Sequence, residues 1–235
     1  MNRCKNIMIL DVETANMTED ALTYDIGFIV ADLHNNIKVE KSLIVYDIYC
    51  QEKKLMQTAY YAKKLPLYEE RIKNKDSQIV SLFHAKKIIR DLMQEYNVKE
   101  VYAYNANFDY SALNRTLRYI SKSLYRYFFP YGTKICCIWN MACHSICNTK
   151  SYARYCIDNN KISKANNCST NAETVYQYLT DTKDFEEEHT GLSDVMIEYF
   201  ILLECLGKHT KRYNFINRCC WQVPQKKFKK VLKNA

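Results

Sequence analysis

Short hydrophobic stretches bounded by polar turns make up the first part of the chain. Residues 7–11, 24–32 and 38–46 are rich in β-branched and aromatic residues, and the polar triplet HNN separates the second stretch from the third. Strands joined by short connections pair side by side and antiparallel. The pattern therefore predicts a three-stranded antiparallel meander.

The hydrophobic period then changes from that of a strand to that of a helix. Apolar residues recur at helical spacing over about residues 78–96, and the stretch EVYAY, residues 100–104, follows as a fourth strand. Because a helix connects it to the meander, this strand is a candidate parallel neighbour of the first. A further helix is expected over about residues 109–120, and a strongly apolar one begins near Thr190. Together these elements predict an α/β fold with a mixed sheet and helices on its faces.

The composition indicates a globular protein and a reducing compartment. The chain has 235 residues, 48% hydrophobic and 26% charged, as expected of a globular protein. No apolar run approaches the ~20 residues that span a bilayer, and the N-terminal residues lack the pattern of a signal peptide. We therefore expect a cytoplasmic protein without a membrane partner, with its eleven cysteines reduced. The net charge of +8 favours a polyanionic partner, although a basic surface that only maintains solubility fits equally well.

Two carboxylates mark the end of the first strand, in the stretch ILDVETA. Alternation along a strand places Asp11 and Glu13 on one face and Val12 on the other. Two carboxylates this close repel each other unless a divalent cation lies between them. A strand end exposed to solvent is the competing interpretation of this pair.

Three more candidate residues lie far away in the sequence. Asp109, in AYNANFDYSAL, could simply cap a helix, but the carboxyl ends of parallel strands meet at one edge of a sheet. That edge would bring it near Asp11 and Glu13. In EEEHTGLSD, Asp194 falls in the first turn of the final helix, and His189 lies on the loop before it. An aspartate on a rigid helix suits a metal ligand, and an imidazole, with an ordinary pKa of about 6.5, suits a general base.

The segments DVET, NANFD and HTGLSD resemble, in order and type, the three motifs of the DnaQ-like DEDDh 3′–5′ exonucleases. That family includes polymerase proofreading subunits, RNase T and oligoribonuclease. The resemblance covers about residues 7–206, and three motifs in order are far more specific than any one alone. A sister subfamily has a tyrosine where this chain has Thr190, so the histidine subfamily is the better match. The resemblance implies a ribonuclease H-like fold, with a mixed five-stranded sheet of three antiparallel strands and then parallel strands, and helices on both faces.

The resemblance also implies roles for individual residues. It matches His189 to the general base and four carboxylates to the ligands of two Mg²⁺ ions, for which Mn²⁺ can substitute: Asp11, Glu13, Asp109 and Asp194. It also assigns three contacts with the substrate: Thr14, Ala15 and Asn105. Where the family often has a glycine after the first motif, this chain has Asn16, which tolerates a left-handed backbone.

The implied reaction is two-metal hydrolysis of the terminal phosphodiester at single-stranded 3′ ends. The products would be nucleoside 5′-monophosphates, and DNA is favoured over RNA as the substrate. A replication polymerase is a candidate partner. The alternatives are a 3′–5′ exoribonuclease and a catalytically weak module that binds nucleic acid or docks on a polymerase.

The rest of the chain is less informative. We expect an exonuclease-like domain over residues 1–210, with a cysteine-rich elaboration at about residues 121–172 and a basic tail at residues 211–235. The stretch ICCIWNMACHSIC could hold zinc in a regulatory protein, but its spacing is not that of paired zinc ligands, so a buried core is favoured. Five lysines in the tail surround apolar residues at helical spacing, which indicates a docked amphipathic helix or a basic arm for nucleic acid.

Overall fold

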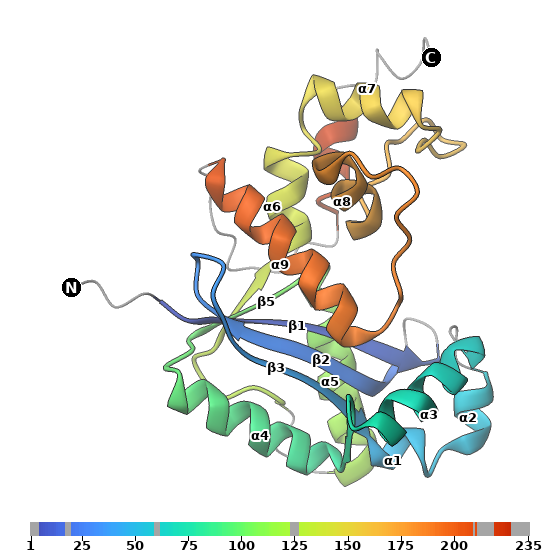
Figure 1. Cartoon of the computed structure of the whole chain (residues 1–235), viewed down its shortest axis with the longest axis vertical. Helices are drawn as coiled ribbons and strands as arrows, with labels where there is room; N and C mark the ends of the chain where they lie inside the picture. Colours follow the sequence, from blue (N-terminus) through green and yellow to red (C-terminus); the bar gives the residue numbers. More distant parts are fainter. Residues whose placement is uncertain are drawn as a thin grey trace. The chain divides into compact units, whose positions relative to one another are not determined.

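The computed structural model describes residues 5–16, 20–58, 62–122, 127–208, 210 and 219–226. The chain forms two compact units, each described by itself (Figure 1). The first comprises residues 1–102, 108–135 and 188–195, and the second comprises residues 103–107, 136–187 and 196–235. None of the helices in the described part of the chain is long and apolar enough to cross a membrane.

A six-stranded mixed sheet, in the order β4-β3-β2-β1-β5-β6, is built mainly from the first unit. Its strands are β1 (Ile7–Ala15), β2 (Leu22–Ala31), β3 (Ile37–Val45), β4 (Gln78–Val80), β5 (Glu100–Ala103) and β6 (Lys134–Cys137). β2 pairs antiparallel with β1 and β3, whereas β5 pairs parallel with β1 and β4 pairs parallel with β3. The predicted α/β architecture is therefore confirmed, with six strands in place of five.

The additional edge strand corrects one expectation from the sequence. Residues 78–80 were expected to begin a helix, but they pair with β3 as β4. Helix α4 (Leu82–Glu95) begins only after Ser81, whose hydroxyl accepts a hydrogen bond from the amide of His84 at 3.2 Å. The apolar residues of a short edge strand and of a helix cannot be distinguished by periodicity alone, whereas the capping serine marks the true start.

Between β3 and β4 the described residues form α1 (Tyr46–Tyr49), α2 (Lys53–Gln57), a 3-10 helix (Ala62–Lys64) and α3 (Leu65–Asn74). Helix α5 (Ala106–Ser121) follows β5 and contains Asp109 in its first turn. Further along the chain lie α6 (Ile138–Ser145), α7 (Lys150–Asp158), α8 (Ala172–Thr180) and α9 (Gly191–Gly207).

The core of the first unit fixes which face of β1 carries its polar residues. Met8, Leu10 and Val12 are buried in one apolar cluster with side chains from α4 and α5. Because successive side chains of a strand point to opposite faces, Asp11 and Glu13 lie on the other face. The alternation expected from the sequence is therefore present.

The second unit contains the cysteine-rich stretch. Cys136, Cys137, Cys143 and Cys147 are buried, as expected of core residues. The side chain of Gln225 bonds both backbone groups of Cys168, at 2.9 Å and 3.0 Å. The apolar residues of the tail, Phe228, Val231 and Leu232, lie outside the described residues.

Candidate active site

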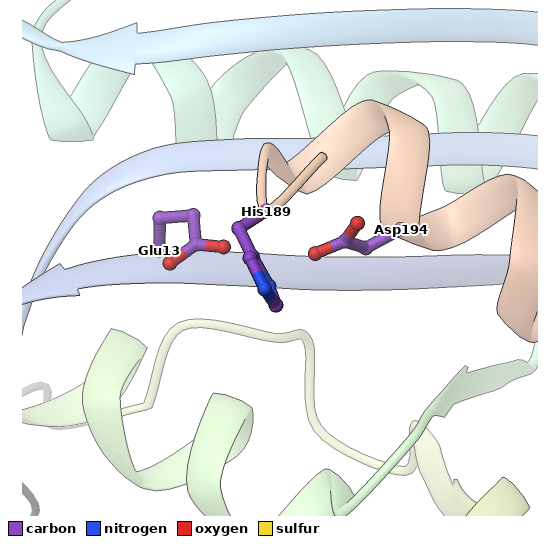
Figure 2. A group of neighbouring side chains, drawn as sticks. All are labelled: Glu13, His189 and Asp194. Atoms are coloured by element: carbon purple, nitrogen blue, oxygen red, sulfur yellow. The ribbon is translucent and has the colours of Figure 1, made fainter. Parts of the chain in front are cut away.

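Three side chains from two distant parts of the sequence converge in the first unit. Glu13 lies near the end of β1, His189 lies just before α9, and Asp194 lies in the first turn of that helix. Each offers one atom able to bind a metal ion, and these atoms all lie within 4.8 Å of one another. In Figure 2 the carboxylates of Glu13 and Asp194 point toward each other with the imidazole of His189 between them. Among the described residues, this is the one group of three or more His, Cys, Asp or Glu side chains that lie close enough together to hold a metal ion.

Asp109 is hydrogen-bonded to β1, the strand that carries Asp11 and Glu13. Its Oδ1 atom accepts a hydrogen bond from the backbone amide of Val12, at 3.3 Å. The side chain is buried, and its Oδ2 atom has no hydrogen-bond partner among the described residues. Burial raises the pKa of Asp109 to about 8, although amide hydrogen bonds, including that from Val12, lower it. The parallel sheet thus places Asp109 beside β1, where the topology predicted it.

Glu13 lies in a strongly negative environment. Burial is the largest cause that raises its pKa, to about 11, and nearby carboxylates raise it further: Asp11, Asp194, Asp25 and Asp109. Without a compensating positive charge, Glu13 therefore keeps its proton at neutral pH. All four carboxylates expected from the sequence belong to one electrostatic cluster.

The cluster suits a hard divalent cation. Carboxylate oxygens are the preferred ligands of Mg²⁺ and Mn²⁺, and here they come from strand β1 and from the first turns of α5 and α9. The buried Oδ2 atom of Asp109 and the mutual repulsion around Glu13 would both be compensated by a cation. The residues present therefore fit such an ion.

The raised pKa of Glu13 predicts how the stability of the metal-free protein depends on pH. Unfolded, Glu13 loses its proton near pH 4.5, whereas the folded protein holds it to about pH 11. Between these values the folded state binds more protons, so the free energy of unfolding falls as pH rises. We expect the melting temperature in EDTA to fall between about pH 5 and pH 8, and Mn²⁺ to reverse most of that fall. Melting temperatures that respond to neither pH nor metal would contradict this account.

Two glycines bring the start of α9 onto the sheet. A Cβ atom on Gly27 of β2 would lie 1.9 Å from the carbonyl carbon of Gly191 and 2.1 Å from the nitrogen of Leu192. A Cβ atom on Gly191 would likewise lie 2.6 Å from the nitrogen of Gly27. Gly27 pairs with Asp11 in the β1–β2 register, so this backbone contact holds the start of α9 beside the carboxylates.

Asp25 is a fifth carboxylate that the motifs did not reveal. It is fully buried on β2, opposite Glu13 in the register. Its Oδ2 atom accepts hydrogen bonds from the amide of Gly191 and the hydroxyl of Tyr68, both at 2.9 Å. The sequence offered one signal for this residue: Asp25 stands inside the mostly apolar stretch LTYDIGFIVA. A carboxylate buried in such a strand requires hydrogen-bond donors.

The residues expected to contact substrate lie at or near irregular backbone: a register shift in β1 and a left-handed residue after β5. A register shift in the β1–β2 pairing falls between Glu13 and Thr14, whose side chain is half-buried. The side chain of Ala15 is fully buried in the core, so any contact with a ligand there would come from its backbone. Asn16 is left-handed, with φ of 66°, as expected from the residue type. Asn105, in the second unit, is left-handed as well, with φ of 62°.

Comparison with known proteins gives a similarity to solved structures, and not to any family model or curated protein. No family model matches the chain, and no curated protein matches it. Among solved structures, the nuclease domain of 3′hExo, a DEDDh family member, bound to rAMP, is similar with a TM-score of 0.45 and 14% sequence identity. The similarity covers 90% of this chain and 98% of that one.

Proposed function

We propose that this protein is a metal-dependent 3′–5′ exonuclease that removes nucleoside 5′-monophosphates from single-stranded ends, with DNA as the favoured substrate. The observation that carries the proposal is the convergence of Glu13, His189 and Asp194 within 4.8 Å, beside a buried Asp109 that is bound to β1. The motifs that supply these residues occur in the order typical of DEDDh exonucleases. The net charge of +8 suits a polyanionic substrate.

The roles of the side chains follow from their positions. Asp11, Glu13, Asp109 and Asp194 would hold divalent cations, which neutralise the carboxylates and polarise the scissile phosphodiester when bound. A water oxygen attacks phosphorus, the bond from phosphorus to the 3′ oxygen breaks, and a ring nitrogen of His189 accepts the proton of the water. The departing 3′ oxygen takes a proton from solvent, so the shortened strand ends in a 3′ hydroxyl.

Single-stranded oligonucleotides labelled at the 5′ end test this proposal. Purified protein with Mg²⁺ or Mn²⁺ should give a ladder of strands shortened from the 3′ end, together with 5′-mononucleotides, and EDTA should stop the reaction. Matched DNA and RNA strands would show which sugar is preferred. Immediate release of the label as a mononucleotide, or undiminished activity in EDTA, would refute the proposal.

His189 should be needed for the chemical step and not for metal binding by the carboxylates. We expect His189→Ala to lower kcat by about 10²–10⁴, the usual contribution of a positioned base, while Mn²⁺ affinity changes little. The wild-type rate should fall on the acid side of its pH profile, because a protonated imidazole cannot accept a proton, and the variant should lose that part of the profile. His84→Ala, on the exposed face of α4, is the matched control. An unchanged rate and pH profile in His189→Ala would exclude this role.

A further inference from the structure

We infer that Asp25, Tyr68 and Arg71 form an anchor, buried at Asp25 and Tyr68 and partly exposed at Arg71, that fixes the turn at residues 188–191 and thereby positions His189 for proton transfer. This inference rests on the proposed function for the reaction step. The existence of the anchor can be tested without it.

Asp25 caps α9 from a neighbouring strand. The first amides of a helix have no partner within the helix, and a side chain usually supplies one from the residue just before it. Here the amide of Gly191, the first residue of α9, donates to Asp25 Oδ2 from 166 positions away in the sequence. Ser42 adds a longer bond to Oδ1, at 3.4 Å. With donors on both oxygens and full burial, Asp25 is suited to holding the backbone and not to binding a metal ion.

Helix α3 holds the other partner of Asp25 and the other end of the turn. Tyr68 and Arg71 are three positions apart, which places them on one face of α3. The Tyr68 hydroxyl donates to Asp25, and the Arg71 guanidinium binds Glu188 Oε2 at 2.6 Å. The turn is therefore held on both sides of His189, at Glu188 by Arg71 and at Gly191 by Asp25.

The rings around Tyr68 keep its hydroxyl in place. Tyr24 meets the Tyr68 ring edge-on, with centroids 5.5 Å apart, and Tyr49 lies 6.2 Å away. The Tyr68 side chain is fully buried. Such packing leaves the hydroxyl few alternative positions, so α3 provides a rigid support for Asp25.

The backbone of His189 explains why a support is needed. Its φ of 54° lies in the left-handed region, which only a few per cent of residues other than glycine adopt, although histidine tolerates it better than most. A conformation of that kind persists only where the surroundings hold it. Without the anchor, the turn would relax and move the imidazole away from Glu13 and Asp194. A shift of about 1 Å at a reacting group can cost about 10²-fold in rate.

A double-mutant cycle tests the positioning role. We expect Asp25→Ala to lower kcat by about 10², and Tyr68→Phe to lower it by about tenfold, because the hydroxyl alone is lost. If the anchor acts through His189, Asp25→Ala adds almost no further loss in a His189→Ala background. Losses that multiply in the double variant would overturn the inference. Tyr119→Phe removes an exposed hydroxyl that binds Glu52 at 2.7 Å, and it serves as the control.

Amide hydrogen exchange of the metal-free protein tests the anchor independently of activity. In Tyr68→Phe and Asp25→Ala, peptides that cover residues 188–194 should exchange about tenfold faster than in the wild type, while those from α4 stay unchanged. Unchanged exchange at the turn would overturn the anchor even in an active enzyme. If the wild-type protein has no nuclease activity, but the turn exchanges faster in the two variants than in the wild type, the proposed function alone is refuted and the anchor stands.

Discussion

A Glu13→Gln variant is expected to lose nucleic-acid hydrolysis and, at the same time, to gain stability without metal. Glu13 is buried among like charges that raise its pKa to about 11. Glutamine has a similar size and is neutral at every pH, so it removes the free-energy cost of keeping Glu13 protonated in the folded protein at neutral pH. It also removes a ligand of the proposed cations, without which the phosphodiester is not activated.

The expected gain can be measured by thermal unfolding in EDTA at pH 7.5. The free energy of unfolding should rise by at least about 1 kcal/mol, which in a chain of this size corresponds to about 2–4 °C in melting temperature. Added Mn²⁺ should stabilise the wild type more than the variant. Glu40→Gln, at an exposed position of β3, should change neither property. A Glu13→Gln protein that stays active, or that is less stable than the wild type in EDTA, would show that the carboxylate cluster is wrongly assigned.

Asp194→Asn should repeat the loss of activity for the same reason. Its carboxylate shares the site with Glu13, and its charge contributes to the raised pKa of that residue. The two variants should not add in stability, because each relieves the same repulsion. Independent effects of the two substitutions would contradict a shared site.

Most of the sheet could be predicted because each long strand is marked by the pattern of apolar residues within its own sequence. Alternating and continuous apolar runs marked β1, β2 and β3, and the crossover through α4 marked β5 as the parallel neighbour of β1. The edge strand β4 was missed because three residues are too few to show a period. The same limit hid β6, which has four residues, and no elements were predicted for the segment that forms α6, α7 and α8.

The site was partly predictable for a different reason. Asp11, Glu13, Asp109, His189 and Asp194 stand in recognisable motifs, and strand topology brings the motifs together. The support of the site has no such signature. Asp25 holds Gly191 across 166 positions of sequence, and the approach of Gly27 to Gly191 depends on the absence of side chains. Contacts of that kind are set by tertiary packing, so single-residue patterns do not reveal them.

Replacing Gly27 by alanine should displace the start of α9 and remove both stability and activity. Gly27 needs no unusual backbone conformation; the substitution is excluded by space, since the new methyl group would lie 1.9 Å from the carbonyl carbon of Gly191. Backbone cannot rotate away as a flexible side chain does, so either β2 or the start of α9 must move. Overpacking of this kind costs about 1–3 kcal/mol or more. Because His189 and Asp194 flank Gly191, a shift of the helix also separates them from Glu13, and a fall in kcat of about 10² or more follows.

Gly207→Ala provides the control for the Gly27→Ala experiment. Gly207 ends the same helix, and a Cβ atom there would meet nothing within 4 Å. Alanine at that position should leave activity unchanged and stability equal or slightly higher. Activity and melting temperature of both variants, measured well below their unfolding transitions, separate displacement of the site from loss of the fold. In folded Gly27→Ala the stabilisation by Mn²⁺ should be reduced along with kcat, because Glu13 and Asp194 no longer face each other. A Gly27→Ala protein with wild-type activity and wild-type metal response would mean that α9 does not reach the sheet through this pair of glycines.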